Sequence, residues 1–215
     1  MQSKINYQLE TDRLLKALPT DRVPVLFLHA CCAPCSSYVL EYLSQYFAIT
    51  LFFYNPNIAP EEEYLHRKAE LKRLVQTMPL SHPVTILDGD YAPERFYALA
   101  KGLEQEPERG ARCQKCIGHR LEEGFRAAAM QTPAPDFVCT TLTISPHKDA
   151  VWINTRGAEL AQQYGIPWLY TDFKKKGGYQ RSIALSREYD LYRQNFCGCV
   201  YSRLEAERRE QQHNS

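Results

Sequence analysis

Three cysteines follow directly on a short apolar run, and this stretch constrains the fold more than any other. The run that begins at Val25 is rich in strand formers, and Cys31, Cys32 and Cys35 come after it with small residues and a proline between them. A helical pattern then covers residues 36–46. The order strand, turn, helix predicts an open α/β sheet, in which reactive groups gather at the carboxyl ends of strands. Free cysteines are often small core residues, but three in five positions indicate a metal or redox site.

Strand and helix patterns alternate along the rest of the chain. Such alternation favours a single α/β domain, residues 1–215, with a parallel sheet, helices on both faces and helical insertions that carry the later cysteines. A helical extension at residues 1–20 and a polar tail at 204–215 are expected to be appendages. The further predicted strands are 48–54, 84–87, 137–142 and 167–170, and the predicted helices are 8–18, 61–78, a short helix from Pro93, 113–130, 148–164 and segments on either side of Cys197.

Composition fits a globular protein without a membrane anchor. Hydrophobic residues make up 44% of the chain, and no apolar stretch is long enough to span a membrane. The first residues lack the apolar core of a signal peptide, so we expect a cytoplasmic protein, in which eight cysteines indicate metal or redox chemistry.

The net charge of +1 does not by itself predict a nucleic-acid partner. Positive charge is concentrated in two segments, with five basic and two acidic residues in 109–126 and nine and six in 171–215. A basic rim there would suit a phosphate-bearing substrate, although a solvated surface of mixed charge explains the same pattern.

The eight cysteines divide into three groups and one isolated residue, Cys139. The groups are Cys31, Cys32 and Cys35; Cys113 and Cys116; and Cys197 and Cys199. Two groups from different loops would supply a four-thiolate shell for zinc or for an iron–sulfur cluster. Adjacent Cys31 and Cys32 are awkward for one tetrahedral ion, so the spacing favours iron–sulfur, with zinc as the alternative. Cys139 lies in an apolar run and is interpreted as a core residue.

The glycine between Cys197 and Cys199 gives the backbone the freedom that a small-ring disulfide requires. A strained disulfide is easily reduced, so we interpret this pair as a two-electron relay, with further metal ligation as the alternative.

Other polar residues have two interpretations each. His29 either bonds a sulfur of the metal centre or is a satisfied histidine at a strand end. The stretch His147-Lys148-Asp149 either donates a proton or binds phosphate, or it forms a helix start. Four residues near the middle cysteines are expected to offset negative charge at a metal centre: Arg112, Lys115, His119 and Arg120.

Several motifs between about residue 23 and residue 203 carry a family resemblance. They include His29-Ala30-Cys31-Cys32-Ala33-Pro34-Cys35-Ser36, Asn55-Pro56-Asn57-Ile58, Tyr64-x-x-Arg67, Arg112-Cys113-x-x-Cys116, Thr140-Thr141-Leu142, Phe173-Lys174-Lys175-x-Gly177-Gly178-Tyr179 and Cys197-Gly198-Cys199. Together they resemble the cobalamin-independent epoxyqueuosine reductases. The resemblance implies a fold similar to the nucleotide alpha-hydrolase (HUP-like) group. It also implies an oxidoreductase that converts the epoxide of epoxyqueuosine, at the wobble position of a tRNA, to the cyclopentene of queuosine in the last step of queuosine biosynthesis.

The resemblance further implies cofactors and roles. Four cysteines would hold a [4Fe-4S] cluster: Cys31, Cys32, Cys113 and Cys116. Cys197 and Cys199 would form a redox-active pair, and Cys35 would be a candidate ligand of an additional iron ion. Four basic residues are expected to contact the tRNA phosphates: Lys174, Lys175, Lys176 and Arg181. The sequence does not identify the electron donor.

Two other classes of protein fit the cysteines alone. One is a zinc-binding or RNA-binding module without catalytic activity, and the other is a thiol–disulfide reductase that acts on proteins.

Overall fold

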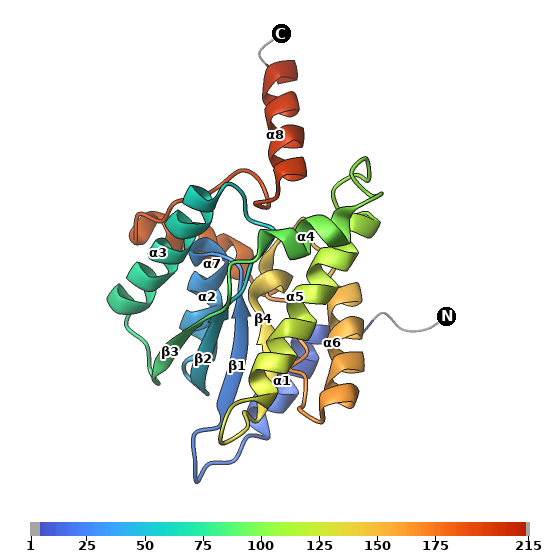
Figure 1. Cartoon of the computed structure of the whole chain (residues 1–215). Coiled ribbons are helices and arrows are strands. Elements are labelled where there is room, and N and C mark those ends of the chain that lie inside the picture. Colours follow the sequence, from blue (N-terminus) through green and yellow to red (C-terminus); the bar gives the residue numbers. More distant parts are fainter. Residues whose placement is uncertain (1–4, 214–215) are drawn as a thin grey trace.

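A parallel sheet of four strands, in the order β3-β2-β1-β4, forms the centre of the computed structural model, which describes residues 5–213 (Figure 1). Strand β1 pairs with β2 on one side and with β4 on the other. The strands are β1 (Val25–Ala30), β2 (Ala48–Phe53), β3 (Val84–Asp88) and β4 (Phe137–Thr140). The strand order changes direction between β1 and β4, and open α/β sheets bind ligands at such a switch point.

Helices cover both faces of this sheet, because successive side chains of a strand point to opposite faces. Leu26 and Leu28 of β1 pack into a core with α2 and α3, whereas Phe27 between them packs into a second core with α5 and α6. The helices are α1 (Tyr7–Lys16), α2 (Ala33–Leu43), α3 (Glu61–Thr77), α4 (Pro93–Ala100), α5 (Ala111–Ala129), the 3-10 helix η1 (Thr141–Ile144), α6 (Ala150–Tyr164), α7 (Gly178–Glu188) and α8 (Val200–His213). The predicted α/β class, with a parallel sheet between helices, is confirmed.

The fifth strand predicted at residues 167–170 is wrong. A single parallel bridge joins Trp168 to Val138, with two backbone hydrogen bonds of 2.8 and 2.9 Å. Beyond the bridge, the side-chain amide of Asn154 accepts from the N–H of Thr171 and donates to its carbonyl. Because a side chain satisfies backbone groups that a strand would have used, the chain leaves the sheet at this point.

Helix α2 begins at Ala33, earlier than the predicted start at residue 36. Cys32 is its N-cap, and Pro34 lies in its first turn, where proline is well tolerated because the N–H it lacks would have no helical partner. Cys35 therefore belongs to the first turn of a helix rather than to a loop. Similarly, the strand predicted at 137–142 ends at Thr140 and continues as η1.

The two predicted terminal helices are present. Helix α1 is anchored to the body by the Thr11 hydroxyl, which donates to the carbonyl of Tyr170 at 2.7 Å. Helix α8 projects away from the sheet (Figure 1). The predicted appendages also include residues 1–4 and 214–215, which lie outside the described residues. Among residues 5–213, no helix combines the length and the apolar character needed to cross a membrane.

Candidate metal centre

The first cysteine group, Cys31, Cys32 and Cys35, lies at the carboxyl end of β1. Its three Sγ atoms lie within 4.8 Å of one another, and those of Cys31 and Cys32 are 3.8 Å apart. Cys31 follows the last residue of β1, and the other two belong to the N-terminus of α2, so a strand and a helix together position the sulfurs. Within residues 5–213, no other three His, Cys, Asp or Glu side chains bring ligand atoms this close. Three soft thiols suit iron or zinc.

Protons are divided unequally within the first cysteine group. Hydrogen bonds from Cys32 and Cys35 lower the pKa of Cys31 well below its ordinary value, and the positive charges of Lys148 and Arg120 act in the same direction. For Cys32, the hydrogen bond to Cys31 and burial raise the pKa to about 12. The hydrogen bond to Cys31 and burial raise the pKa of Cys35 as well. The hydrogen bonds therefore favour the thiolate form at Cys31 over that at Cys32 or Cys35.

The second cysteine group, Cys113, Cys116, Cys197 and Cys199, comes from α5 and from the segment before α8. Cys116 and Cys199 pack into one small buried cluster with Phe96. Burial raises the pKa of Cys116 to about 12, and the neighbouring Cys197, Cys199 and Cys113 act in the same direction. The four cysteines are thus electrostatic neighbours, although they come from different elements.

Two cavities meet between the two cysteine groups. One, of about 310 Å³, is lined by the first cysteine group and Cys197. The other, of about 330 Å³, is lined by all four members of the second cysteine group. Five residues line both cavities: Glu108, Arg120, His147, Lys148 and Cys197. Because the cavities share this wall, one centre placed between them would have thiols of both groups as neighbours.

The cavity at the first cysteine group is positively charged. Its lining includes one acidic residue, Glu108, and five basic residues: Arg67, Arg120, Lys148, Arg193 and Arg209. Burial by itself would lower the pKa of Lys148, but the nearby Cys197, Cys31 and Cys35 raise it above its ordinary value, so Lys148 stays charged. Such a lining favours anions, whether thiolates, sulfides or phosphates.

His29 is a satisfied histidine at the end of β1. Its Nε2 lies 3.1 Å from the carbonyl oxygen of Tyr54, and its Nδ1 lies 2.9 Å from the hydroxyl of Thr140. A carbonyl only accepts, so Nε2 carries the hydrogen and Nδ1 accepts from Thr140. Burial lowers the pKa of His29 to about 3, which leaves the ring neutral near pH 7. With both nitrogens occupied, His29 has no N–H left for a metal-bound sulfur.

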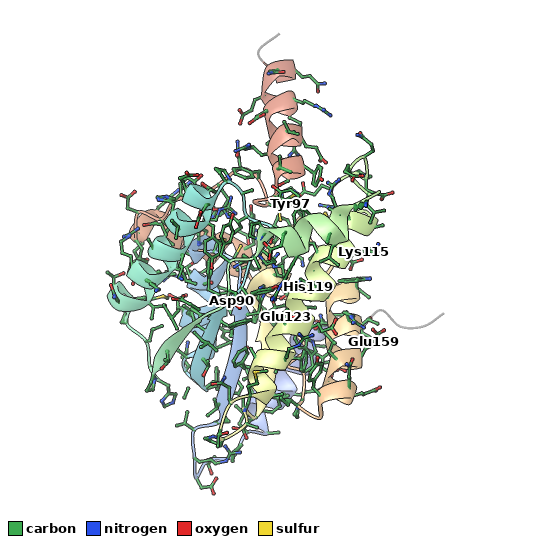
Figure 2. All side chains as sticks on the ribbon, in the orientation of Figure 1. Asp90, Tyr97, Lys115, His119, Glu123 and Glu159 are labelled. Carbon is green, nitrogen blue, oxygen red and sulfur yellow. The ribbon has the colours of Figure 1, made fainter. Side chains whose placement is uncertain are left out.

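Only part of the expected charge compensation is found at the cavities. Arg120 lines both. Arg112 lines the cavity of the second cysteine group, where its charge opposes the burial that raises the pKa of Cys113 and Cys199, and its guanidinium also donates to backbone carbonyls of the 103–106 loop. Lys115 and His119 line neither cavity. His119 lies 2.9 Å from the hydroxyl of Tyr54, on the side of α5 where Figure 2 also shows Asp90 and Glu123. Lys115 and His119 are close to Cys113 and Cys116 in the sequence, but they do not face the thiols, because they lie on another side of α5.

The basic residues predicted to contact RNA are mostly paired in this structure. Three have acidic partners: Lys174 with Asp172, Lys176 with Asp12 and Arg181 with Glu41. Lys174 also donates to the carbonyl of Thr143 at 3.0 Å, so it points inward. Lys175 is exposed. The loop leads into α7, whose Tyr179 and Ser182 line the cavity at the first cysteine group.

Sequence reasoning did not single out Arg67 as a site residue, and it included Lys148 only in the stretch 147–149, as a candidate for proton donation or phosphate binding. Arg67 lies on α3, is 2% exposed and lines the cavity at the first cysteine group. Arg67 lies within a motif quoted above, but neither its position in the sequence nor that of Lys148 indicates that these residues face cysteines. Cys139, in contrast, is fully buried in the core as predicted.

Comparison with known proteins agrees with this arrangement. The family model described as epoxyqueuosine reductase QueH matches residues 26–205. The chain is 40% identical to epoxyqueuosine reductase QueH of Streptococcus pyogenes over 202 residues, which are 93% of this chain and 78% of that protein. It is 42% identical to the protein of that name from Haemophilus influenzae over 82% of this chain and 71% of the other, and 33% identical to that from Thermotoga maritima over 84% and 91%. The resemblance seen in the motifs is confirmed, and the chain belongs to the epoxyqueuosine reductase QueH family.

Proposed function

We propose that this protein reduces the epoxide of epoxyqueuosine, at the wobble position of a tRNA, to the cyclopentene of queuosine, which is the last step of queuosine biosynthesis. The family gives the reaction. The observation that carries it to this chain is the first cysteine group, which opens into a cationic cavity also lined by Cys197. A tRNA substrate also leads us to place the protein in the cytoplasm.

The residues present fit an iron–sulfur centre. The first cysteine group brings three thiols within 4.8 Å, and Cys113 and Cys116 line the adjoining cavity. We assign Cys31, Cys32, Cys113 and Cys116 to a [4Fe-4S] cluster and Cys35 to an additional iron ion. When bound, such a centre supplies single electrons and a Lewis-acidic metal. The charges of Lys148 and Arg120 offset the negative charge that thiolates and sulfides bring into the cavity.

The reaction needs two electrons and two protons. One C–O–C epoxide is converted to a C=C bond, and its oxygen leaves as water. Oxidation of the Cys197 and Cys199 thiols to a disulfide releases two electrons and two protons, so the pair matches the demand of one turnover. An external reductant then has to return the disulfide to the dithiol. His147, which lines both cavities and is exposed, is a candidate to deliver a proton.

The wobble nucleotide has to leave the anticodon stack to enter the cavity. Phe196 and Tyr179 line the cavity and offer aromatic surfaces on which an extruded base stacks. Lys175 and Lys176 lie shortly before Tyr179 in the chain and are exposed, so we assign them to anticodon phosphates. Lys174, which points inward, and Arg181, which pairs with both Glu41 and Glu188, contribute less than the sequence alone predicts.

One anaerobic experiment tests the proposal. The purified, reconstituted protein is analysed for iron and zinc and by absorption spectroscopy, and is then incubated with dithionite and a tRNA that carries epoxyqueuosine. We expect a brown, iron-containing protein whose charge-transfer absorption bleaches on reduction, and a product nucleoside that lacks one oxygen atom by mass spectrometry. A tRNA that carries guanine at the wobble position is the matched control and should remain unchanged.

The alternatives give different results in the same experiment. A zinc-binding or RNA-binding module would be colourless, would contain zinc after reconstitution and would leave the nucleoside unchanged. A thiol–disulfide reductase would act on protein disulfides without iron. Either result would rule out the proposed reaction.

A further inference from the structure

The segment at residues 189–199, between α7 and α8, contains no helix or strand and is held against α3 by side chains. Arg73 donates to the carbonyls of Tyr189 and Asp190, each at 2.9 Å. The Glu70 carboxylate accepts from the N–H of Tyr192 at 3.0 Å. Glu70 and Arg73 lie one turn apart on the same side of α3. This side of the helix runs along the segment toward its cysteines.

Arg67 makes the contact of α3 that lies nearest to the cysteine pair. Its Nη1 donates to the carbonyl of Cys197 at 3.0 Å, and its Nε donates to Glu63 at 2.6 Å. Its guanidinium also lies over the ring of Phe196, with Cζ 5.0 Å from the ring centroid. With only 2% of Arg67 exposed, the guanidinium is fixed by an acceptor on each of two nitrogens and by an aromatic face.

The backbone at Gly198 lies close against Arg67 and Ile58. Its φ of +126° lies in a region that only glycine adopts readily, and an added Cβ would lie 3.0 Å from Nη1 of Arg67 and 2.9 Å from Ile58. The carbonyl of Gly198 accepts from the N–H of Ala59 at 2.9 Å. Two successive carbonyls, those of Cys197 and Gly198, are therefore held from outside the loop.

We propose that Arg67 is a positioning residue for the loop Cys197-Gly198-Cys199. By holding the Cys197 carbonyl and the Phe196 ring, it keeps the pair at the cavity wall, where Cys197 lines both cavities. Arg67 itself exchanges no electron and acts only through the loop. The consequence for turnover rests on the proposed function, because it requires Cys197 and Cys199 to be the redox pair.

Arginine is suited to this task, and lysine is a poor substitute. A planar guanidinium donates to two acceptors and stacks on an aromatic ring at once, whereas an ammonium group bonds only one acceptor well from the same position. Arg67→Gln removes both the charge and the planar set of donors, whereas Arg67→Lys keeps the charge. Arg73→Gln is the control, because it removes a contact to the same segment far from the cysteines.

The first measurement is hydrogen–deuterium exchange on the full, iron-loaded chain. A hydrogen bond to a charged group restrains local opening, so in Arg67→Gln we expect the amides of residues 195–201 to exchange about tenfold to a hundredfold faster. Arg67→Lys should give an intermediate rate. Arg73→Gln should accelerate exchange at 189–192 and leave 195–201 at the wild-type rate.

The second measurement is steady-state kinetics with iron content determined on the same samples. Arg67→Gln should lower kcat about tenfold or more at unchanged KM and unchanged iron, because the pair is displaced while substrate binding is kept. Arg73→Gln should leave kcat and KM at their wild-type values.

Several results would overturn the proposal. They are wild-type exchange at 195–201 in Arg67→Gln, faster exchange spread over the whole chain, or loss of iron. Failure of the proposed function is recognised separately: the wild type would then leave epoxyqueuosine unchanged. If only the redox role of the pair is wrong, Cys197→Ser would retain full activity, and in both cases the exchange data still decide whether Arg67 holds the loop.

Discussion

The first cysteine group and the pair of Cys197 and Cys199 are positioned by different means. The first group is held by regular structure, since Cys31 directly follows a central strand and Cys32 and Cys35 open the next helix. The pair belongs to a segment that side chains such as Arg67 hold in place. Backbone hydrogen bonds of a sheet open only with large parts of the fold, whereas a segment held by side chains opens locally.

This difference matches two kinds of chemistry. Metal ligands need sulfurs at fixed separations, which a strand end and a helix start provide. A thiol pair that cycles between dithiol and disulfide has to change its own geometry, because the disulfide imposes a short S–S distance and a defined dihedral angle. The position of the first group and that of the pair therefore agree with the roles proposed for them, and the first two experiments below test that division.

The largest effect is expected for a ligand of the first cysteine group. Cys32→Ser should lose most of its iron, because a hydroxyl is a poor ligand for a soft metal and the buried N-cap offers no replacement. Cys35→Ser should lose a smaller share, that of the additional iron ion. Iron per chain after anaerobic reconstitution is the measurement. Cys139→Ser, at a buried cysteine that lines neither cavity, is the control and should keep all of its iron. Full iron in Cys32→Ser would disprove the assignment.

The second effect concerns the cysteine pair. Cys197→Ser and Cys199→Ser should keep the iron and the absorption spectrum but lower kcat by about a hundredfold or more, because a single thiol is unable to supply two electrons as a disulfide. Thiol counting after a single turnover should show that the wild type loses two thiols per product. If either variant loses most of its iron, the pair belongs to the metal shell and shares the role of the first cysteine group.

A smaller effect is expected at the loop before α7. Lys175→Gln with Lys176→Gln should weaken tRNA binding and reduce the slope of log K against log salt concentration by about 0.7 to 0.9 for each lost phosphate contact. Lys174 is left in place, because it holds the carbonyl of Thr143. Lys101→Gln, at an exposed lysine that lines neither cavity, is the control. An unchanged slope would move RNA docking to another surface.

The smallest effect is expected at the amino ends of β1 and β4, which lie at the edge of the sheet opposite the first cysteine group. The Asp136 carboxylate accepts from the N–H of Val25 at 2.8 Å and pairs with Arg22. The hydrogen bond from Arg22 lowers the pKa of Asp136. A folded-state pKa below the unfolded value means that this stabilisation is complete above the unfolded pKa and is lost as the pH falls through the folded one.

Asp136→Asn should therefore lower the free energy of unfolding at pH 7 by about 0.5 to 1 kcal/mol, a value discounted because Arg22 is 56% exposed. The gap to the wild type should shrink below about pH 4, where the wild-type carboxylate takes up a proton. Urea unfolding of the metal-free protein at several pH values measures it. A gap that grows on acidification would contradict this interpretation.

Local features of the sequence determined the class of the fold and the place of its chemistry. The strand that ends at Cys31 and the helix that follows depend on neighbouring residues, so their periodicity was sufficient to predict them. The same holds for most other elements, because each follows from its own apolar pattern. The exception is the strand predicted at 167–170, where a distant side chain, that of Asn154, decides the path of the backbone.

The tertiary structure decided which groups face one another. Spacing in the sequence placed Lys115 and His119 beside the cysteines, but neither lines a cavity, and His119 contacts the hydroxyl of Tyr54 instead. Conversely, Arg67 and Lys148 are far from Cys197 in the chain and reach it through the packing of α3 and the loop before α6. Lysines that look free in the sequence prove to be paired with carboxylates of other elements. Contacts of this kind depend on which sides of distant elements are packed together, and local periodicity carries no information about that choice.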